Sequence, residues 1–286
     1  MDLPLFFVLS SGFVLFLALF LRLGGLGSGP NSGSGSGLAG PAQLVVVSLT
    51  TSPTRIGHIE PLLRALGTQT RAPDRVVLNL PRVFRRTGAT FGELPAFVTG
   101  NALVHVNWVD DIGPATKIVP TAALVDAPEA VIISVDDDIE YKPTMVESML
   151  AVSANFPDAV ITGESFRATS GPYAELVEGY SSVLYKRRHL DGLDGPAIGA
   201  MPLACYLADD LVISNHLRSR GIAIVRASAL GVVPFGDIYL EYGERADALK
   251  NGAGGASRGN LDNYARCARH LAETGALRLT PPEARS

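Results

Sequence analysis

The chain has 286 residues, of which 47% are hydrophobic and 18% are charged. This composition excludes a disordered or fibrous protein, and the length allows one large domain or two small ones. The formal net charge is -4 and there is no run of basic residues, so we expect no nucleic-acid partner.

An apolar segment opens the chain, from Leu3 to Leu21, without a charged residue. As a helix it would reach about 28 Å, enough to cross the hydrocarbon core of a bilayer. We predict an uncleaved transmembrane anchor over residues 1–23. A cleaved signal peptide is the alternative, but the basic residues that begin such peptides are missing. Arg22 follows the segment and favours a cytosolic body.

The predicted anchor makes this a single-pass membrane protein, of the Golgi or endoplasmic reticulum type in a eukaryote and of the inner membrane in a bacterium. Residues 24–42 are rich in glycine and serine, which is typical of a flexible linker. We expect one folded domain over residues 43–275 and a C-terminal tail over residues 276–286.

The first half of the body alternates between predicted strands and helices. Apolar runs predict strands at Gln43–Ser52, Arg75–Leu80, Asn101–Trp108 and Ala130–Val135. Helical spacing predicts helices at Ile59–Leu66 and Lys117–Val125. This pattern is typical of an α/β fold whose mostly parallel sheet is flanked by helices. Ligands bind beyond the carboxyl ends of such strands, so Thr50–Arg55 and Asp136–Asp138 should lie on one rim.

The acidic triplet Asp136–Asp138 follows a predicted buried strand and needs a compensating cation. In an extended segment Asp136 and Asp138 would share a face while Asp137 points away. Two convergent carboxylates suit Mg²⁺ or Mn²⁺, which complete their coordination with water and diphosphate oxygens. The alternative is a polar turn whose charges are solvated.

Two cysteines, Cys205 and Cys267, are too few for a disulfide-rich scaffold and lack the spacing of a zinc site. We expect two ordinary buried thiols, because free cysteine is among the most buried residue types. A single bridge between them is the alternative.

Four blocks in the body resemble the nucleotide-sugar glycosyltransferases of GT-A fold and are similar to glycosyltransferase family 2. They are VVVSLTTSPTRI, GPATKIVP, VIISVDDDIEY and LADDLVISNHL, and the resemblance extends from Leu44 to Tyr264. It implies a GT-A domain, which is a Rossmann-like, mostly parallel sheet flanked by helices. It also implies a nucleotide-sugar donor, for which a UDP-sugar is expected, and Mn²⁺ or Mg²⁺.

The resemblance also implies roles for individual residues. The metal ligands would be Asp136 and Asp138. The catalytic pair would be Asp209 and Asp210. The residues that bind the donor would be Thr50, Thr51, Arg55, Lys117 and Asp137. The family usually has Glu-Asp where this chain has Asp209-Asp210, and the resemblance favours Asp210 as the base.

The residues around Asp209 and Asp210 predict a helix that begins at this pair and ends near Gly221. Aspartate is a preferred N-cap, so Asp209 is expected to cap the helix or to support its neighbour. Asp210, near the positive end of the helix, is expected to keep a low pKa and to act as an ionised general base. The simplest reaction is then a single displacement with inversion.

Other polar residues allow two interpretations. Lys117 follows a Gly-Pro turn, where it would contact donor phosphate or be solvated. For the cluster Arg82, Arg85 and Arg86 a solvated loop is favoured over diphosphate binding. Tyr180 is a candidate for the acceptor side, and neither His216 nor His270 is assigned to the metal.

Two other functions remain open at this stage. One is a metal-dependent phosphoryl-group hydrolase or nucleotidyltransferase on a similar scaffold, since carboxylates and a metal also serve those reactions. The other is a sugar-binding protein without turnover. The acceptor, whether glycan, lipid or protein, is not indicated.

Overall fold

The computed structural model describes residues 43–166, 176–238 and 260–279, which belong to one compact unit that begins at Gln43. The predicted anchor and linker, residues 1–42, lie outside the described residues, as do residues 280–286 of the predicted tail. Within the described ranges, no helix is long and apolar enough to cross a membrane.

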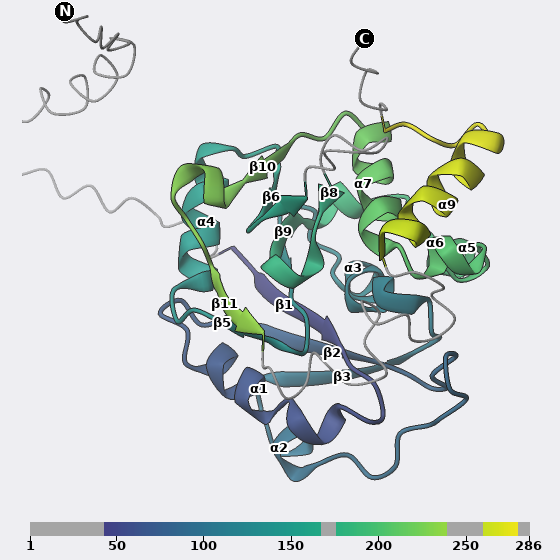
Figure 1. Ribbon diagram of the computed structural model, residues 1–286. Coiled ribbons are helices and arrows are strands. Elements are labelled where there is room, and N and C mark those ends of the chain that lie inside the picture. The colour runs from purple at the N-terminus through teal and green to yellow at the C-terminus, as the bar shows by residue number, and fades with distance from the viewer. Residues whose placement is uncertain (1–42, 167–175, 239–259, 280–286) are drawn as a thin grey trace, which may run out of the picture. The chain divides into compact units, whose positions relative to one another are not determined.

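The body is built on a seven-stranded sheet with the strand order β10-β6-β9-β4-β1-β2-β3 (Figure 1). Its strands are β1 (Val45–Thr50), β2 (Arg75–Pro81), β3 (Val104–Val109), β4 (Val131–Ser134), β6 (Val160–Thr162), β9 (Val183–Lys186) and β10 (Ile224–Arg226). All neighbouring strands are parallel except that β9 runs antiparallel to both β4 and β6. The prediction of an α/β fold with a mostly parallel sheet is confirmed.

Two antiparallel strand pairs accompany this sheet. They are β5 (Ile139–Tyr141) with β11 (Phe235–Ile238) and β7 (Ser165–Phe166) with β8 (Leu176–Val177). The pair β5–β11 matters for the site because β5 begins directly after the acidic triplet.

Helices cover both faces of the sheet. The α-helices are α1 (Glu60–Gly67), α2 (Ala96–Thr99), α3 (Val119–Leu124), α4 (Met145–Asn155), α5 (Gly195–Gly199), α6 (Leu203–Tyr206), α7 (Asp209–Ser219) and α9 (Asn260–Glu273). The 3-10 turns are η1 (Ile56–His58), η2 (Gly113–Lys117), η3 (Gly179–Ser181), η4 (Arg187–Leu190) and η5 (Ala227–Leu230). The helix expected from Lys117 begins instead at Val119, because Pro120 fits only the first helical turn.

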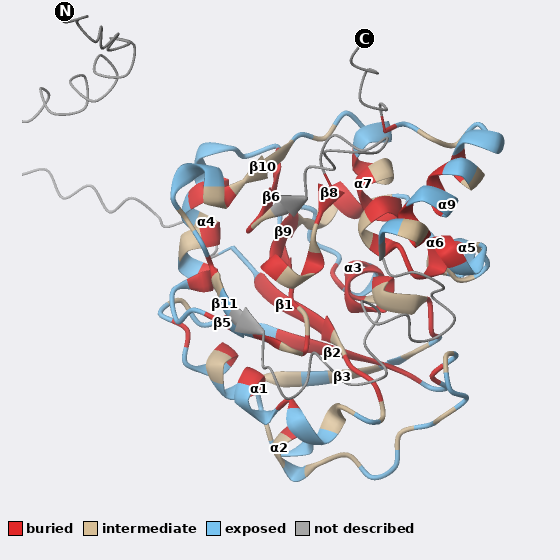
Figure 2. Ribbon diagram, viewed as in Figure 1, coloured by how far each residue is buried: buried red, intermediate tan, exposed pale blue. Residues whose placement is uncertain are grey.

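The apolar runs of the central strands follow from this double coverage. Along β1, Val45 and Val47 belong to the buried cluster that includes residues of α1 and α4, whereas Val46 belongs to the cluster that includes residues of α3, α7 and α9. All three valines are buried, and β1 is coloured as buried in Figure 2. A strand covered on both faces buries every side chain, which is why the sequence does not alternate there.

A disulfide joins Cys205 of α6 to Cys267 of α9, with their Cα atoms 4.6 Å apart. The expectation of two free buried thiols was therefore wrong. The two residues are 62 positions apart, and they meet because α9 packs against α6. The packed core also continues to Leu279, beyond the boundary predicted at residue 275.

Candidate active site

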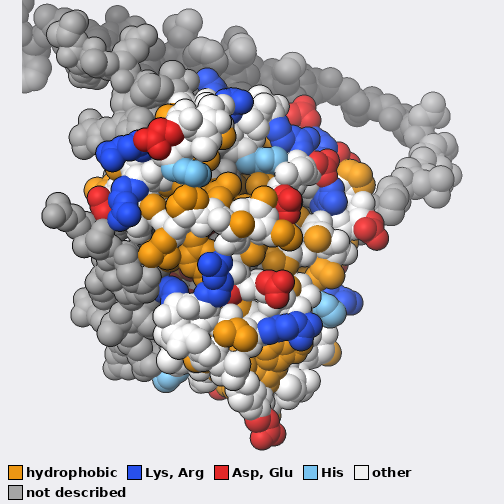
Figure 3. Space-filling model, turned by 90° about the vertical axis from the view of Figure 1, so that its right-hand side faces the viewer, with side chains coloured by type: hydrophobic (Ala, Val, Ile, Leu, Met, Phe, Trp, Pro, Cys, Tyr) orange, Lys and Arg blue, Asp and Glu red, His pale blue; other side chains and the backbone are white. Residues whose placement is uncertain are grey.

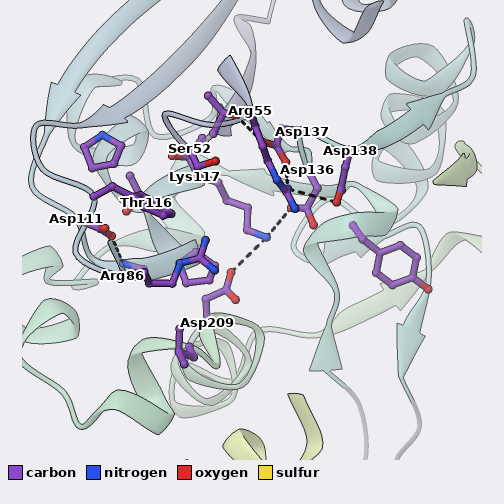
Figure 4. A pocket seen from close by; sticks show the side chains of 18 of the residues that line it. Ser52, Arg55, Arg86, Asp111, Thr116, Lys117, Asp136, Asp137, Asp138 and Asp209 are labelled. Atoms are coloured by element: carbon purple, nitrogen blue, oxygen red, sulfur yellow. Dashed lines mark hydrogen bonds and ion pairs between the residues drawn. The ribbon is translucent and has the colours of Figure 1, made fainter. Parts of the chain in front are cut away.

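A cavity of about 270 Å³ opens beyond the carboxyl ends of β1 and β4 (Figure 4). It is lined by every residue that the sequence assigned to a site, namely Thr50, Thr51, Arg55, Lys117, Asp136, Asp137, Asp138, Tyr180, Asp209 and Asp210. The prediction that Thr50–Arg55 and Asp136–Asp138 lie on one rim of the sheet is thus confirmed, because residues of both segments line the cavity. The parallel pairing of β1 with β4 brings the two segments together.

The acidic triplet lies in the turn between β4 and β5 and not in an extended strand, because β4 ends at Ser134. The prediction that Asp136 and Asp138 share one face of an extended segment was therefore wrong about the backbone conformation. Asp137 is buried and accepts hydrogen bonds from the Thr51 hydroxyl at 2.5 Å and from Arg55 at 2.7 Å. Asp138 lies 3.4 Å from the same guanidinium. Arg55 thus ties the loop after β1 to the acidic turn.

Tyr141 of β5 holds the backbone of the acidic turn. Its hydroxyl accepts the backbone N–H of Asp136 at 2.8 Å and donates to the carbonyl of Tyr180 at 2.9 Å. The Tyr141 side chain is buried. One phenol therefore holds together the acidic turn and the segment that carries Tyr180.

Lys117 is the second cation of the site. Its ammonium nitrogen lies 2.8 Å from Asp136 and 3.4 Å from Asp209 (Figure 4). Burial alone would lower the pKa of Lys117, but the surrounding carboxylates raise it well above its usual value, so the side chain stays charged. The interpretation of Lys117 as a solvated lysine is wrong, because the residue is buried.

A buried hydrogen-bond network holds the backbone of Lys117. The Ser48 hydroxyl on β1 contacts both the Lys117 carbonyl and the Thr121 hydroxyl. The Asn79 amide on β2 donates to Thr121 at 2.8 Å and to Ser48 at 3.2 Å, and it accepts from Asn107 on β3. Three adjacent strands therefore position this lysine, because buried polar groups stay paired in a folded protein.

Asp209 and Asp210 are the first two residues of α7, as predicted, but neither caps the helix. The N-cap is Ala208, and the side-chain cap expected of Asp209 is wrong. Asp209 instead lines the cavity and pairs with Lys117. Asp210 accepts a hydrogen bond from the Gly179 N–H at 3.1 Å and from the Tyr264 hydroxyl at 2.9 Å.

The expectation that Asp210 keeps a low pKa is also wrong. Burial, together with the neighbouring charge of Asp209, raises the pKa of Asp210 to about 8. These two effects outweigh the helix N-terminus, whose influence is modest. Burial and the adjacent aspartates likewise raise the pKa of Asp138 to about 6.

The charges that line the cavity are unbalanced. Six aspartates face three basic side chains, Arg55, Arg86 and Lys117. An added divalent cation would offset the excess negative charge, and the hard oxygens of Asp136 and Asp138 suit Mn²⁺ or Mg²⁺. Among residues 43–166, 176–238 and 260–279, no group of three or more His, Cys, Asp or Glu side chains could hold a metal alone. Such an ion would therefore need oxygens from substrate or water.

The cavity also contains residues that the sequence analysis did not assign. Arg86, expected in a solvated loop, lines the cavity, whereas Arg82 and Arg85 are exposed. Arg85 lies over the Tyr206 ring at 4.6 Å. The Tyr206 hydroxyl donates to Asp111 at 2.7 Å, and both residues line the cavity.

Tyr264 of α9 reaches the cavity from the far end of the chain. No motif in the sequence singles out this tyrosine. Neither His216 nor His270 lines the cavity.

No protein-family model matches this chain, and no curated protein matches its sequence. Several solved structures are similar to it. A mannosyltransferase from Pyrobaculum calidifontis, in complex with GDP-Man and Mn²⁺, is 13% identical with a TM-score of 0.45. The match covers 64% of this chain and 54% of the mannosyltransferase, so this chain spans about half of that protein's length.

Two further structures show the range of similar proteins. Glucosyl-3-phosphoglycerate synthase from Mycobacterium tuberculosis, in complex with Mn²⁺, UDP-glucose and glycerol 3-phosphate, is 11% identical with a TM-score of 0.43, covering 65% of this chain and 70% of the synthase. A 4-diphosphocytidyl-2C-methyl-D-erythritol synthase is 13% identical with a TM-score of 0.38, covering 64% and 88%.

Proposed function

We propose that this protein is a metal-dependent glycosyltransferase that moves a sugar from a nucleoside-diphosphate sugar to an acceptor hydroxyl. The observation that supports it best is the position of Asp210, which lines the same cavity as the acidic turn Asp136–Asp138. Burial raises the pKa of Asp210, so its ionised form is a stronger proton acceptor than an exposed aspartate. Groups suited to hold a donor and a group suited to activate an acceptor thus share one site.

The donor would be bound by groups on two loops. Thr50, Thr51 and Arg55 line the rim after β1, where a nucleotide can approach, and Lys117 supplies positive charge for the diphosphate. Asp136 and Asp138 would hold Mn²⁺ or Mg²⁺, whose charge stabilises the departing nucleoside diphosphate. Asp137 is already paired with Arg55 and Thr51, so its role is to orient that arginine.

Asp210 would act as the general base. Its carboxylate takes the proton of the acceptor hydroxyl while that oxygen forms a bond to the anomeric carbon. The bond between the anomeric carbon and the diphosphate oxygen breaks, and the nucleoside diphosphate leaves. A single displacement of this kind inverts the anomeric configuration. Asp209 supports the reaction by holding Lys117 at 3.4 Å.

The position of the protein in the cell is a further part of the proposal. The apolar segment Leu3–Leu21 would anchor the chain in a membrane, and residues 24–42 would tether the domain. The disulfide between Cys205 and Cys267 favours a domain that faces an oxidising compartment. This is the opposite of the side that Arg22 favours. Labelling of free thiols in intact and permeabilised cells would decide between the two.

Incubating the purified chain with a panel of nucleotide sugars, with and without Mn²⁺, tests the activity. We expect Mn²⁺-dependent release of a nucleoside diphosphate and transfer of the sugar to an added hydroxyl acceptor. A phosphoryl-group enzyme would instead release a sugar phosphate or a nucleoside monophosphate. Binding of the donor without any product would indicate a sugar-binding protein and would contradict the proposal.

A further inference from the structure

We propose that Tyr264 is a positioning residue for Asp210, and that the Cys205–Cys267 disulfide keeps it there by fastening α9 to α6. The inference rests on the proposed function for the role of Asp210 as base. The helix α9 lies outside the four blocks that carried the family resemblance, and Tyr264 is the last residue that the resemblance covers.

Both oxygens of the Asp210 carboxylate are held by the protein. The Gly179 N–H donates to Oδ1 at 3.1 Å, and the Tyr264 hydroxyl donates to Oδ2 at 2.9 Å. Each carboxylate oxygen has two lone pairs, so either oxygen can still accept a proton from a substrate. The two donors therefore fix the direction of the carboxylate without blocking it.

The state of the phenol agrees with this role. Tyr264 is 6% exposed and lines the cavity. Burial and the neighbouring charge of Asp210 raise the pKa of Tyr264 well above its ordinary value, so the hydroxyl keeps its proton and donates it to the carboxylate. A donated hydrogen bond to the ionised form of Asp210 favours the state that a base needs.

The disulfide is built into the same face of α9. Tyr264, Cys267, Ala268 and Leu271 are all buried, and their spacing of three and four residues puts them on one side of the helix. Cys267 lies one turn from Tyr264, and its bridge ends on α6, three residues before Ala208, the N-cap of α7. The bridge thus connects the helix that carries Tyr264 to the segment that leads into Asp210.

The outward side of α9 offers a matched control. The helix lies on the right-hand side in Figure 1, the side that faces the viewer in Figure 3. Leu261 on this helix is 63% exposed and does not line the cavity. A change at Leu261 perturbs the same helix without touching the Tyr264 hydroxyl.

The first test measures the contact and does not depend on any activity. Urea unfolding is compared for the wild type, Tyr264→Phe, Asp210→Ala and the double variant. If the hydroxyl bonds the carboxylate, the two single effects on the free energy of unfolding will not add. Additive shifts of the midpoint would overturn the contact.

The second test measures the consequence for transfer. Tyr264→Phe keeps the ring, so a role in packing alone predicts wild-type kinetics. We expect kcat to fall roughly 10- to 100-fold, the scale of a misplaced catalytic group, while KM for the donor stays within about twofold. Leu261→Ala should match the wild type. An unchanged kcat in Tyr264→Phe, or a loss confined to KM, would overturn the positioning role.

The third test concerns the disulfide. The variant Cys205→Ala with Cys267→Ala should lose kcat to a similar extent, and adding Tyr264→Phe to it should cause little further loss. A wild-type kcat without the bridge would overturn its part in the proposal. If the wild type transfers sugar from no donor, the proposed function fails, while the unfolding comparison still decides whether Tyr264 holds Asp210.

Discussion

The ammonium nitrogen of Lys117 lies 2.8 Å from a carboxylate oxygen of Asp136, and this contact joins the turn after β3 to the turn after β4. Both residues come from motifs that are separate in the sequence. Their contact gives the acidic turn a fixed positive neighbour before any donor binds. We therefore predict that donor affinity depends on where the Lys117 ammonium lies, and not only on its charge.

Gly179→Ala tests the position of Lys117 without changing its charge. A Cβ atom at residue 179 would lie 2.1 Å from the Lys117 nitrogen. The end of the lysine side chain must then move, because it is more flexible than the backbone. We expect the Kd for UDP in the presence of Mn²⁺ to rise about tenfold or more, since hydrogen bonds to charged groups contribute about 1.5–3 kcal/mol. Calorimetric titration measures it.

Gly92→Ala is the matched control for Gly179→Ala. No heavy atom lies within 4 Å of the Cβ that this change would add, and the residue has no positive φ. Its nucleotide affinity should equal that of the wild type. Equal affinities in both alanine variants would show that the position of Lys117 does not matter for binding.

Asp138→Ala separates the metal from the fold. Burial and the neighbouring aspartates raise the pKa of Asp138, so its ionised form lowers the stability of the folded chain at neutral pH. Removing it should leave the Tm of the metal-free protein unchanged or raise it, while Mn²⁺-dependent nucleotide binding is lost. Asp158→Ala, at an exposed aspartate, should retain binding. Full Mn²⁺-dependent binding by Asp138→Ala would rule out the metal assignment.

Thr121→Val tests the network behind Lys117. The change keeps the shape of the buried side chain but leaves the Asn79 amide without one of its acceptors. We expect the free energy of unfolding to fall by about 1–3 kcal/mol, the cost of an unsatisfied buried polar group, measured by urea denaturation. Thr70→Val removes an exposed hydrogen bond to Glu147 and should cost less. A larger loss at Thr70 would contradict the account.

His189 gives a pH dependence of stability. Burial, followed by the charges of Arg188 and Lys186, lowers the pKa of His189 to about 4, against about 6.5 in the unfolded chain. Between these pH values the unfolded chain binds a proton that the folded chain does not. Stability from this residue is therefore complete above pH 6.5 and is lost as the pH falls towards 4, by about 2–3 kcal/mol.

The measurement compares urea unfolding of the wild type and His189→Asn from pH 8 to pH 4. The asparagine oxygen can replace Nδ1, which accepts the Lys186 N–H at 3.2 Å. The free energy of unfolding of the wild type, relative to that of His189→Asn, should fall as the pH falls from 6.5 towards 4. A constant difference for His189→Asn would refute the assignment.

The sequence predicted the sheet and the location of the site because both depend on local patterns. Apolar runs identify β1, β2 and β4, and parallel pairing of β1 with β4 then requires Thr50–Arg55 and Asp136–Asp138 to meet. The carboxyl ends of adjacent parallel strands lie at one edge, whatever the rest of the chain does.

The remaining features depend on contacts between distant segments. The disulfide and the contact of Tyr264 with Asp210 require α9 to pack beside α6 and α7, which no local pattern encodes. The pKa of Asp210 was predicted in the wrong direction because burial and Asp209 outweigh the helix N-terminus. Lys117 was left open between two interpretations because its burial depends on β1 and β2.

The central claim is that Asp210 activates the acceptor while other groups hold the donor. The most direct measurement is the rate of sugar transfer by Asp210→Asn, with Kd for UDP and Mn²⁺ determined on the same samples. We predict an unchanged Kd and a rate that falls roughly 100- to 10,000-fold, the range for a positioned general base. Asp209→Asn, which keeps a polar neighbour for Lys117, should lose less. Normal transfer by Asp210→Asn, or loss confined to Asp209→Asn, would contradict the account.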